Sequence, residues 1–303
     1  MFYDLLVIGD DREGLDSAVT TARLGHRAAI VLDHEQPPSA EILAKGAELE
    51  VQRRRGVTMW GWRSEIERLT DQLRSGQDSL LRAVGIDQFP GRARFIAPTS
   101  VEVRAGKQNQ LASAARFVIA CGTVSRQPAS FQIDGRRVVV AEMLMKLDEI
   151  PRSALVVGAG VTGRTAALTL ARLGVEVTVV DEHVSLFDLF QIFDDSFDLF
   201  QSMQIAFRLG EEVIGTELLE NRQPAVRLAS GRILRADVIV VCVGREGNTR
   251  DLNLEAVDVG LDERGRVWCD SAGQTWSPHV VAVGDVVGFS GRSSQRSRLV
   301  SAS

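Results

Sequence analysis

The stretch that decides the fold is residues 154–181, ALVVGAGVTGRTAALTLARLGVEVTVVD. Its first four residues are apolar, a glycine-rich turn follows, and residues 166–173 carry the spacing of a helix that Gly174 ends. A second apolar run, residues 177–180, closes on Asp181. Short runs of β-branched residues without polar alternation are typical of strands covered on both faces of a parallel sheet. The stretch therefore predicts a strand–turn–helix–strand unit of an α/β fold.

The turn has the spacing G-x-G-x-x-G at Gly158, Gly160 and Gly163, and Asp181 lies 23 positions beyond the first glycine (181 − 158). With a strand before it and a helix after it, this is the dinucleotide-binding fingerprint, in which the middle glycine lets the backbone approach the pyrophosphate. Asp181 would accept hydrogen bonds from the adenosine ribose and repel a 2′-phosphate. No arginine follows in residues 182–185, so NAD(H) is favoured over NADP(H). The alternative is a turn of the same fold that binds nothing.

Residues 5–33 repeat this layout near the start of the chain. Gly9 and Gly14 stand at the first and third glycine positions, and Asp33 ends the second apolar run. The middle position is Asp11, whose side chain obstructs the backbone and carries the wrong charge for a phosphate. A carboxylate about 4 Å from a phosphate costs roughly 4 kcal/mol at an effective dielectric constant near 20. Two interpretations of this N-terminal unit have equal weight. It either binds a dinucleotide, or keeps the fold but binds a dinucleotide weakly or not at all.

Three further segments have the composition of known motifs: residues 120–123 (ACGT), 244–249 (GREGNT) and 275–285 (TWSPHVVAVGD). They look like the A-T-G turn, the G-R-x-x-N-T segment and the second FAD motif of the two-dinucleotide flavoproteins. The chain therefore resembles the pyridine nucleotide–disulfide oxidoreductases over about residues 3–289. Within that superfamily it resembles the soluble pyridine nucleotide transhydrogenases and the dihydrolipoamide dehydrogenase-like flavoproteins.

The resemblance implies an α/β fold with two Rossmann-like dinucleotide-binding domains, parallel central sheets and small antiparallel β-meanders. We expect residues 1–150 to form the first part of an FAD-binding-type domain, into which an NAD(P)-binding domain, residues 151–270, is inserted. Residues 271–289 would then return a strand to the first domain. Residues 290–303 are rich in serine and arginine without an apolar period, so we expect a disordered tail.

The cofactors that the resemblance implies are FAD and a nicotinamide dinucleotide. The residues it assigns to FAD are Gly9, Gly14, Asp33, Gly122, Gly284 and Asp285. The fingerprint assigns Gly158, Gly160, Gly163 and Asp181 to the nicotinamide dinucleotide, and the resemblance adds Gly244.

The chain departs from the family pattern in its reactive groups. Residues 34–39 lack the redox cysteines, Ala40 stands where the family has a lysine near the flavin, and Thr165 stands where many members have its glutamate partner. Transhydrogenases do not need the disulfide, because hydride passes between nicotinamide and flavin without a thiol relay. We also expect the C-terminal interface domain, with its dimer interface and catalytic His–Glu pair, to be absent. The sequence assigns no catalytic residue.

The composition is that of an ordinary globular protein. The chain has 303 residues, a net charge of −5, 45% apolar and 25% charged residues. Its mild acidity argues against nucleic acid or an anionic membrane as the main partner and favours small-molecule dinucleotides. The three cysteines, Cys121, Cys242 and Cys269, are too far apart in sequence for a local dithiol or a thiolate metal site. No apolar run approaches a membrane span of about 18 residues, and no signal peptide precedes the first strand, so we expect a cytoplasmic protein.

These features favour an FAD/NAD(P)-dependent oxidoreductase of the soluble transhydrogenase type, which moves hydride between NAD(P)H and flavin. Two alternatives stay open. One is a non-catalytic relative that binds NAD(H) alone and serves as a sensor or partner module. The other is a truncated gene product with weak or no FAD binding.

Overall fold

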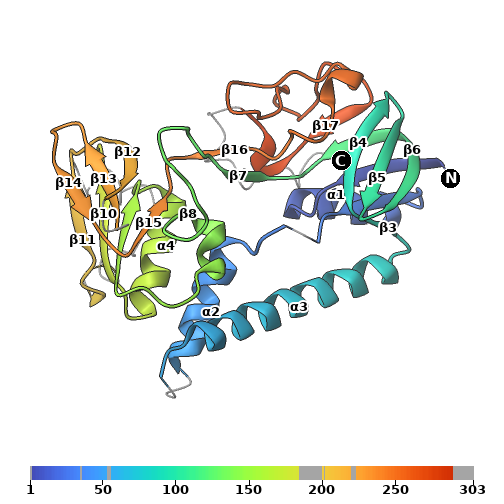
Figure 1. Cartoon of the computed structure of the whole chain (residues 1–303). Coiled ribbons are helices and arrows are strands. Elements are labelled where there is room, and N and C mark those ends of the chain that lie inside the picture. Colours follow the sequence, from blue (N-terminus) through green and yellow to red (C-terminus); the bar gives the residue numbers. More distant parts are fainter. Residues whose placement is uncertain are drawn as a thin grey trace. The chain divides into compact units, whose positions relative to one another are not determined.

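The computed structural model describes residues 2–34, 36–52, 56–183, 200, 202–219 and 223–288. The expected disordered tail, residues 290–303, lies outside the described residues. The chain divides into two compact units (Figure 1). Unit 1 comprises Met1–Gln36, Gln77–Val124 and Glu246–Ser303, and unit 2 comprises Pro37–Gly76 and Ser125–Arg245. The domain bounds expected from the sequence stay a prediction.

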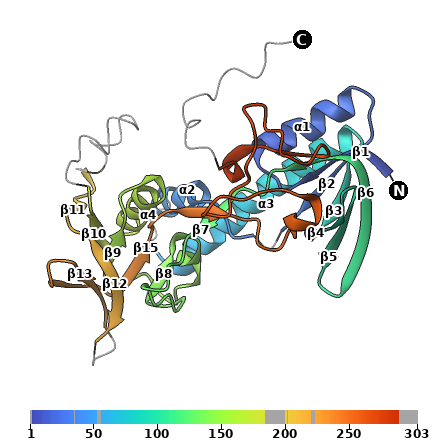
Figure 2. The ribbon, with the colours of Figure 1, turned by 90° about the horizontal axis from the view of Figure 1, so that it is seen from above.

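Unit 1 is built on a seven-stranded sheet in the order β3-β2-β1-β6-β5-β4, with β17 also paired to β6. The parallel strands are β1 (Phe2–Ile8), β2 (Ala28–Leu32), β3 (Asp87–Pro90), β6 (Gln108–Ile119) and β17 (Val280–Ala282). Two antiparallel strands, β4 (Arg92–Ala97) and β5 (Ser100–Ala105), extend the sheet beyond β6 as a meander (Figure 2). Every residue of β2 is buried, as expected for a strand covered on both faces.

Helix α1 (Arg12–Arg23) connects β1 to β2 and packs on both strands. It buries only small residues, Gly14 and Ala18, so its backbone lies close to the sheet. A short 3-10 helix, η2 (Leu254–Val257), packs on β4, and another, η3 (Gly284–Val286), follows β17. The strands β7 (Thr123–Ser125) and β16 (Arg245–Gly247) pair where the chain passes from one unit to the other.

Unit 2 contains a five-stranded parallel sheet in the order β11-β10-β9-β15-β8. Its strands are β8 (Val138–Val140), β9 (Ser153–Val157), β10 (Glu176–Asp181), β11 (Ala206–Leu209) and β15 (Val238–Val241). Helix α4 (Val161–Arg172) covers the sheet, and helix α2 (Ala40–Gln52) packs on α4 (Figure 1). A small antiparallel sheet joins β12 (Val213–Leu218), β13 (Pro224–Leu228) and β14 (Ile233–Arg235). The predicted α/β architecture, with parallel sheets and small antiparallel meanders, is confirmed.

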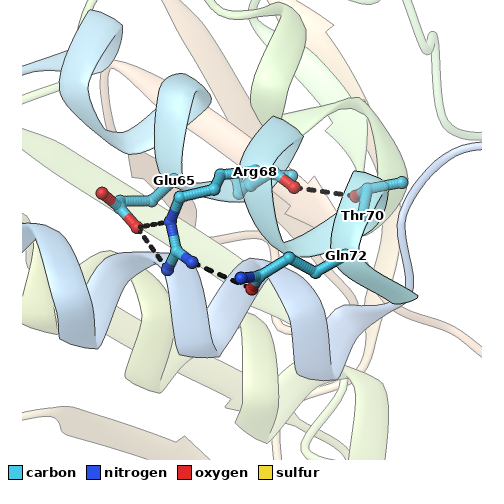
Figure 3. A network of polar contacts seen from close by, with 5 residues as sticks. Glu65, Arg68, Thr70 and Gln72 are labelled. Atoms are coloured by element: carbon cyan, nitrogen blue, oxygen red, sulfur yellow. Dashed lines mark hydrogen bonds and ion pairs between the residues drawn. The ribbon is translucent and has the colours of Figure 1, made fainter. Parts of the chain in front are cut away.

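Helix α3 spans Met59–Ala83, and Gly76 does not interrupt it. Side-chain contacts along its surface support the helix (Figure 3). Arg68 donates to the buried carboxylate of Glu65 at 2.9–3.0 Å and to Gln72 at 2.9 Å, while Thr70 donates to a backbone carbonyl one turn back. Contacts three and four residues apart each add a few tenths of a kcal/mol, roughly 0.2–0.5, to a helix. They help offset the glycine, which costs about 1 kcal/mol relative to alanine.

The sequence did not predict helix α2. Residues 141–146 form a 3-10 helix, η1 (Ala141–Lys146). The buried positions of α2 are Leu43, Gly46, Ala47 and Glu50, which have helical spacing but are only partly apolar. Glu50 is buried because its carboxylate accepts hydrogen bonds from the backbone N–H and the hydroxyl of Thr58, at 3.2 and 3.3 Å. A face of this composition carries too weak an apolar period to be recognised.

Candidate functional site

The glycine turn of unit 2 connects β9 to α4. Gly158 has a φ of +100°, and a Cβ atom there would lie 2.3 Å from the carbonyl oxygen of Cys242 on the neighbouring strand end. A Cβ atom on Gly163 would lie 1.8 Å from the carbonyl oxygen of Gly158, so only glycine lets α4 start this close to the strand. Both glycines are therefore required by close backbone packing.

Gly160 has a different role in the same turn. It is the N-cap of α4, and no atom lies within 4 Å of the position that a Cβ on this residue would take. The first N–H groups of a helix have no partner within the helix and, with the helix dipole, attract an anion. The N-terminus of α4 is therefore accessible to an anion such as a phosphate.

Asp181, the last residue of β10, is held against this turn. Its carboxylate accepts a hydrogen bond from the backbone N–H of Ala159 at 2.5 Å and another from the backbone N–H of His183 at 2.9 Å. Burial alone would raise the pKa of Asp181, but these hydrogen bonds and the His183 side chain outweigh it, and the pKa is lowered. The group is thus a charged acceptor held in a fixed orientation beside the glycine turn.

The imidazole Nδ1 of His183 lies 2.5 Å from the same carboxylate, and its ring is 63% exposed. The sequence did not predict this contact of His183. The available signal in the sequence was that His183 follows Asp181, the acid that ends the strand, by two residues.

The carboxyl ends of the parallel strands bring the other predicted residues of unit 2 to one edge of the sheet. β9 lies between β10 and β15, so Asp181 is on one side of the Gly158 turn, and Gly244, which follows β15, is on the other. The chain order reverses between β9 and β15, the place where ligands bind in open α/β sheets. Gly244 has a φ of +112° and open space around it. The next residue, Arg245, forms an ion pair of 3.0 Å with Glu142, which the sequence reasoning also missed.

Unit 1 repeats the close-packed glycines. Gly9 has a φ of +103°, and its Cβ would lie 2.2 Å from the carbonyl oxygen of Ala120 at the end of β6. A Cβ on Gly14 would lie 2.4 Å from the methyl group of Ala120. The turn geometry of a dinucleotide fold is therefore retained in this unit as well.

The side chain of Asp11, however, enters this turn and lies against Gly122 and Gly284. Its Oδ1 lies 3.0 Å from the position of a Cβ on Gly122, and its Oδ2 lies 2.7 Å from that of a Cβ on Gly284. Burial raises its pKa to about 7, helped by the charges of Asp285, Asp10 and Glu13, and opposed by a hydrogen bond from the backbone of Asp285. Asp11 thus places a carboxyl group in this turn where it conflicts with a phosphate.

Asp33, at the end of β2, is the position that corresponds to Asp181. Its carboxylate is 15% exposed and lies 3.1 Å from Nε of Arg92, which also approaches Asp251 at 3.8 Å. A dinucleotide ribose at Asp33 would share this carboxylate with Arg92. The second FAD motif places Asp285 in η3 with its side chain exposed.

The three cysteines are buried and form no disulfide. Burial raises the pKa of both Cys121 and Cys242 to about 12, so these thiols stay protonated near neutral pH. Among the residues that the structure describes, no cluster of His, Cys, Asp and Glu could hold a metal ion. In the same part of the chain, no helix is long and apolar enough to cross a membrane.

Two units that each place a glycine turn and an acid at the carboxyl edge of a parallel sheet define a protein with two dinucleotide folds. Residues 3–303 match the family described as "Pyridine nucleotide-disulphide oxidoreductase", and the chain belongs to it. This confirms the resemblance inferred from the motifs.

The chain is 29% identical over 313 residues to the soluble pyridine nucleotide transhydrogenase of Mycobacterium bovis, covering 95% of this chain and 66% of the relative. It is also 29% identical over 311 residues to the dihydrolipoyl dehydrogenase of Chlamydia muridarum, covering 94% and 66%. The flavoprotein disulfide reductase RclA from Escherichia coli, solved as a Cu(II) complex, has the same fold, with a TM-score of 0.77 at 21% identity, covering 95% of this chain and 67% of that one. The chain thus spans about two thirds of the length of these relatives.

Proposed function

We propose that the protein is an FAD/NAD(P)-dependent oxidoreductase of the soluble transhydrogenase type, in which unit 2 binds the nicotinamide dinucleotide. The observation that carries the proposal is the open space at Gly160 beside the fixed carboxylate of Asp181. The amides of the first turn of α4 would hold the pyrophosphate, and Asp181 would accept hydrogen bonds from the adenosine ribose. Family membership supports the reaction class.

We propose that NAD(H) is preferred over NADP(H). Asp181 keeps its negative charge at neutral pH because its pKa is lowered, so it repels a 2′-phosphate on the ribose. One pair of unit charges about 4 Å apart costs about 4 kcal/mol at an effective dielectric constant of 20. Even a fraction of this energy gives a large preference, since about 1.4 kcal/mol corresponds to a factor of ten in affinity.

For the flavin, Asp33, Gly122 and Asp285 of unit 1 stand at the positions that would hold FAD. When bound, FAD would accept hydride from the nicotinamide. The turn does not fit a pyrophosphate while Asp11 is ionised, because the carboxylate lies in the turn against Gly122 and Gly284 and its negative charge repels a phosphate. This observation favours a second candidate, a relative that binds NAD(H) without flavin.

Titration of the purified protein with NADH and NADPH, followed by calorimetry, tests the nucleotide site. We expect NADH to bind more tightly, and Asp181→Asn to reduce this preference. Glu176→Gln is the matched control, because Glu176 is an exposed acid at the opposite end of the same strand. A protein that binds neither nucleotide would refute the proposal.

The absorbance of the purified protein separates the two candidates. Flavin absorbance that NADH bleaches supports the oxidoreductase. NADH binding in a colourless protein that also ignores added FAD at every pH would establish the second candidate.

A further inference from the structure

Residues 11 and 160 occupy the same place in the two units, two residues after the first glycine of each turn and at the N-cap of the following helix. Their backbones are alike: φ and ψ are −54° and 147° at Asp11, and −62° and −179° at Gly160. The space beyond Gly160 is open, whereas the side chain of Asp11 enters the corresponding space of unit 1. The two units therefore differ in what occupies the turn and not in its shape.

We infer that the Asp11 carboxylate is a built-in anion beside the phosphate position of unit 1, whose negative charge repels a dinucleotide phosphate, so that this turn accepts one only when Asp11 is neutral. The inference rests on the proposed function only in taking unit 1 as a dinucleotide fold.

The surroundings of Asp11 support this assignment. Gly122 and Gly284, which both have positive φ, lack the Cβ atoms that its two oxygens would meet at 3.0 and 2.7 Å. The backbone of Asp285 donates a hydrogen bond to the carboxylate. Asp11 makes no side-chain cap to α1, so the carboxylate points into the glycine-lined space and not back to the helix. A phosphate oxygen in such a turn would likewise accept backbone N–H groups.

The charges around Asp11 make its neutral form accessible near neutral pH. The groups that act on it are Asp285 from η3, Asp10 before the helix and Glu13 on α1, all acids. From the segment that follows β6, the Cys121 thiol interacts with it, and the pKa of this thiol is raised to about 12 by burial and by Asp11. Together with burial they raise the pKa of Asp11 to about 7. Protonated Asp11 can donate a hydrogen bond to a phosphate oxygen, so a phosphate that binds above this pH takes up one proton with it.

The experiment is a titration with FAD, followed by flavin fluorescence, of wild type, Asp11→Gly, Asp11→Asn and the control Asp16→Asn. Asp16 is an exposed acid on α1, so the control removes the same charge without touching the turn. At pH 8 we expect Asp11→Gly to bind FAD at least tenfold more tightly than wild type, and Asp16→Asn to stay within about twofold. Wild type should gain about tenfold in affinity from pH 8 to pH 6, as the neutral fraction of a group with a pKa of about 7 does, whereas Asp11→Asn should not.

The inference is overturned if Asp11→Gly binds FAD no better than Asp16→Asn, or if the affinity of wild type and of Asp11→Asn has the same pH dependence. The pH dependence of FAD binding by wild type tests the inference even if the variants fail to fold. The Asp11 carboxyl resonance in ¹³C NMR gives the pKa of Asp11 without flavin. A carboxyl that titrates near 4 would also overturn the inference. NADH, titrated into the same samples, reports unit 2. Loss of NADH binding in every sample would therefore refute the proposed function and leave the Asp11 comparison intact.

Discussion

Replacing Asp11 with asparagine should stabilise the folded protein, by an amount that depends on pH. Asparagine keeps the shape of the side chain and an oxygen that accepts the hydrogen bond from the Asp285 backbone, but it carries no charge. Folding raises the pKa of Asp11 from 3.8 to about 7, so the folded state holds a proton that the unfolded state releases. The stability of wild type therefore falls as the pH rises from about 4 to about 7, and the variant lacks this loss.

The size of the effect follows from the shift. About three pKa units at about 1.4 kcal/mol each give a ceiling of about 4 kcal/mol above pH 7. Asp11 is only partly buried, and water screens the charge, so we expect about half of the ceiling. The variant should exceed wild type by about 2 kcal/mol in the free energy of unfolding at pH 8, and by about 1 kcal/mol or less at pH 5.

Urea unfolding of wild type, Asp11→Asn and Asp16→Asn at pH 5, 6, 7 and 8, followed by circular dichroism, measures these differences. The exposed control should stay within about 0.5 kcal/mol of wild type at each pH. A difference between Asp11→Asn and wild type that stays constant from pH 5 to pH 8, or that has the opposite sign, would refute the assignment of a raised pKa to Asp11.

Three other substitutions test the nucleotide site of unit 2. Gly160→Asp should keep the fold, because the extended backbone accepts any residue. It should weaken NADH binding in calorimetry at least about 100-fold, since it places a carboxylate at the phosphate. An unchanged affinity for NADH would contradict the assignment of this site. Gly163→Ala should lower the free energy of unfolding by about 3 kcal/mol, because its Cβ meets the Gly158 carbonyl oxygen; an unchanged melting temperature would count against this packing. Asp181→Asn should lower the ratio of NADPH to NADH dissociation constants about tenfold, and an equal shift in Glu176→Gln would remove Asp181 from the explanation.

The fold was predictable because its main signals are local. Runs such as residues 154–157 and 177–180 are β-branched and uninterrupted, and each is followed by a glycine turn or an acid. Such runs identify parallel strands, and the strict spacing of Gly158, Gly160 and Gly163 identifies the turn. The same local rule identified Asp11 as the departure in unit 1.

The partners of the site residues were harder to predict, because they come from distant parts of the chain. Arg92, which pairs with Asp33, lies 59 positions away, and no spacing rule connects the two. The direction of the Asp11 side chain depends on Gly122 and Gly284, which only the folded sheet brings beside it. Sequence alone therefore located the conflicting charge but not the space that it fills.

The similar backbones at positions 11 and 160 also bear on how such a protein changes over generations. Both positions have extended conformations that glycine and aspartate can adopt, so the domain stays folded when one residue replaces the other. Codons for these two amino acids can differ by a single base. On the role proposed here for Asp11, a lineage that carries this fold would silence or reopen a nucleotide site by one point mutation, while the rest of the domain stays unchanged.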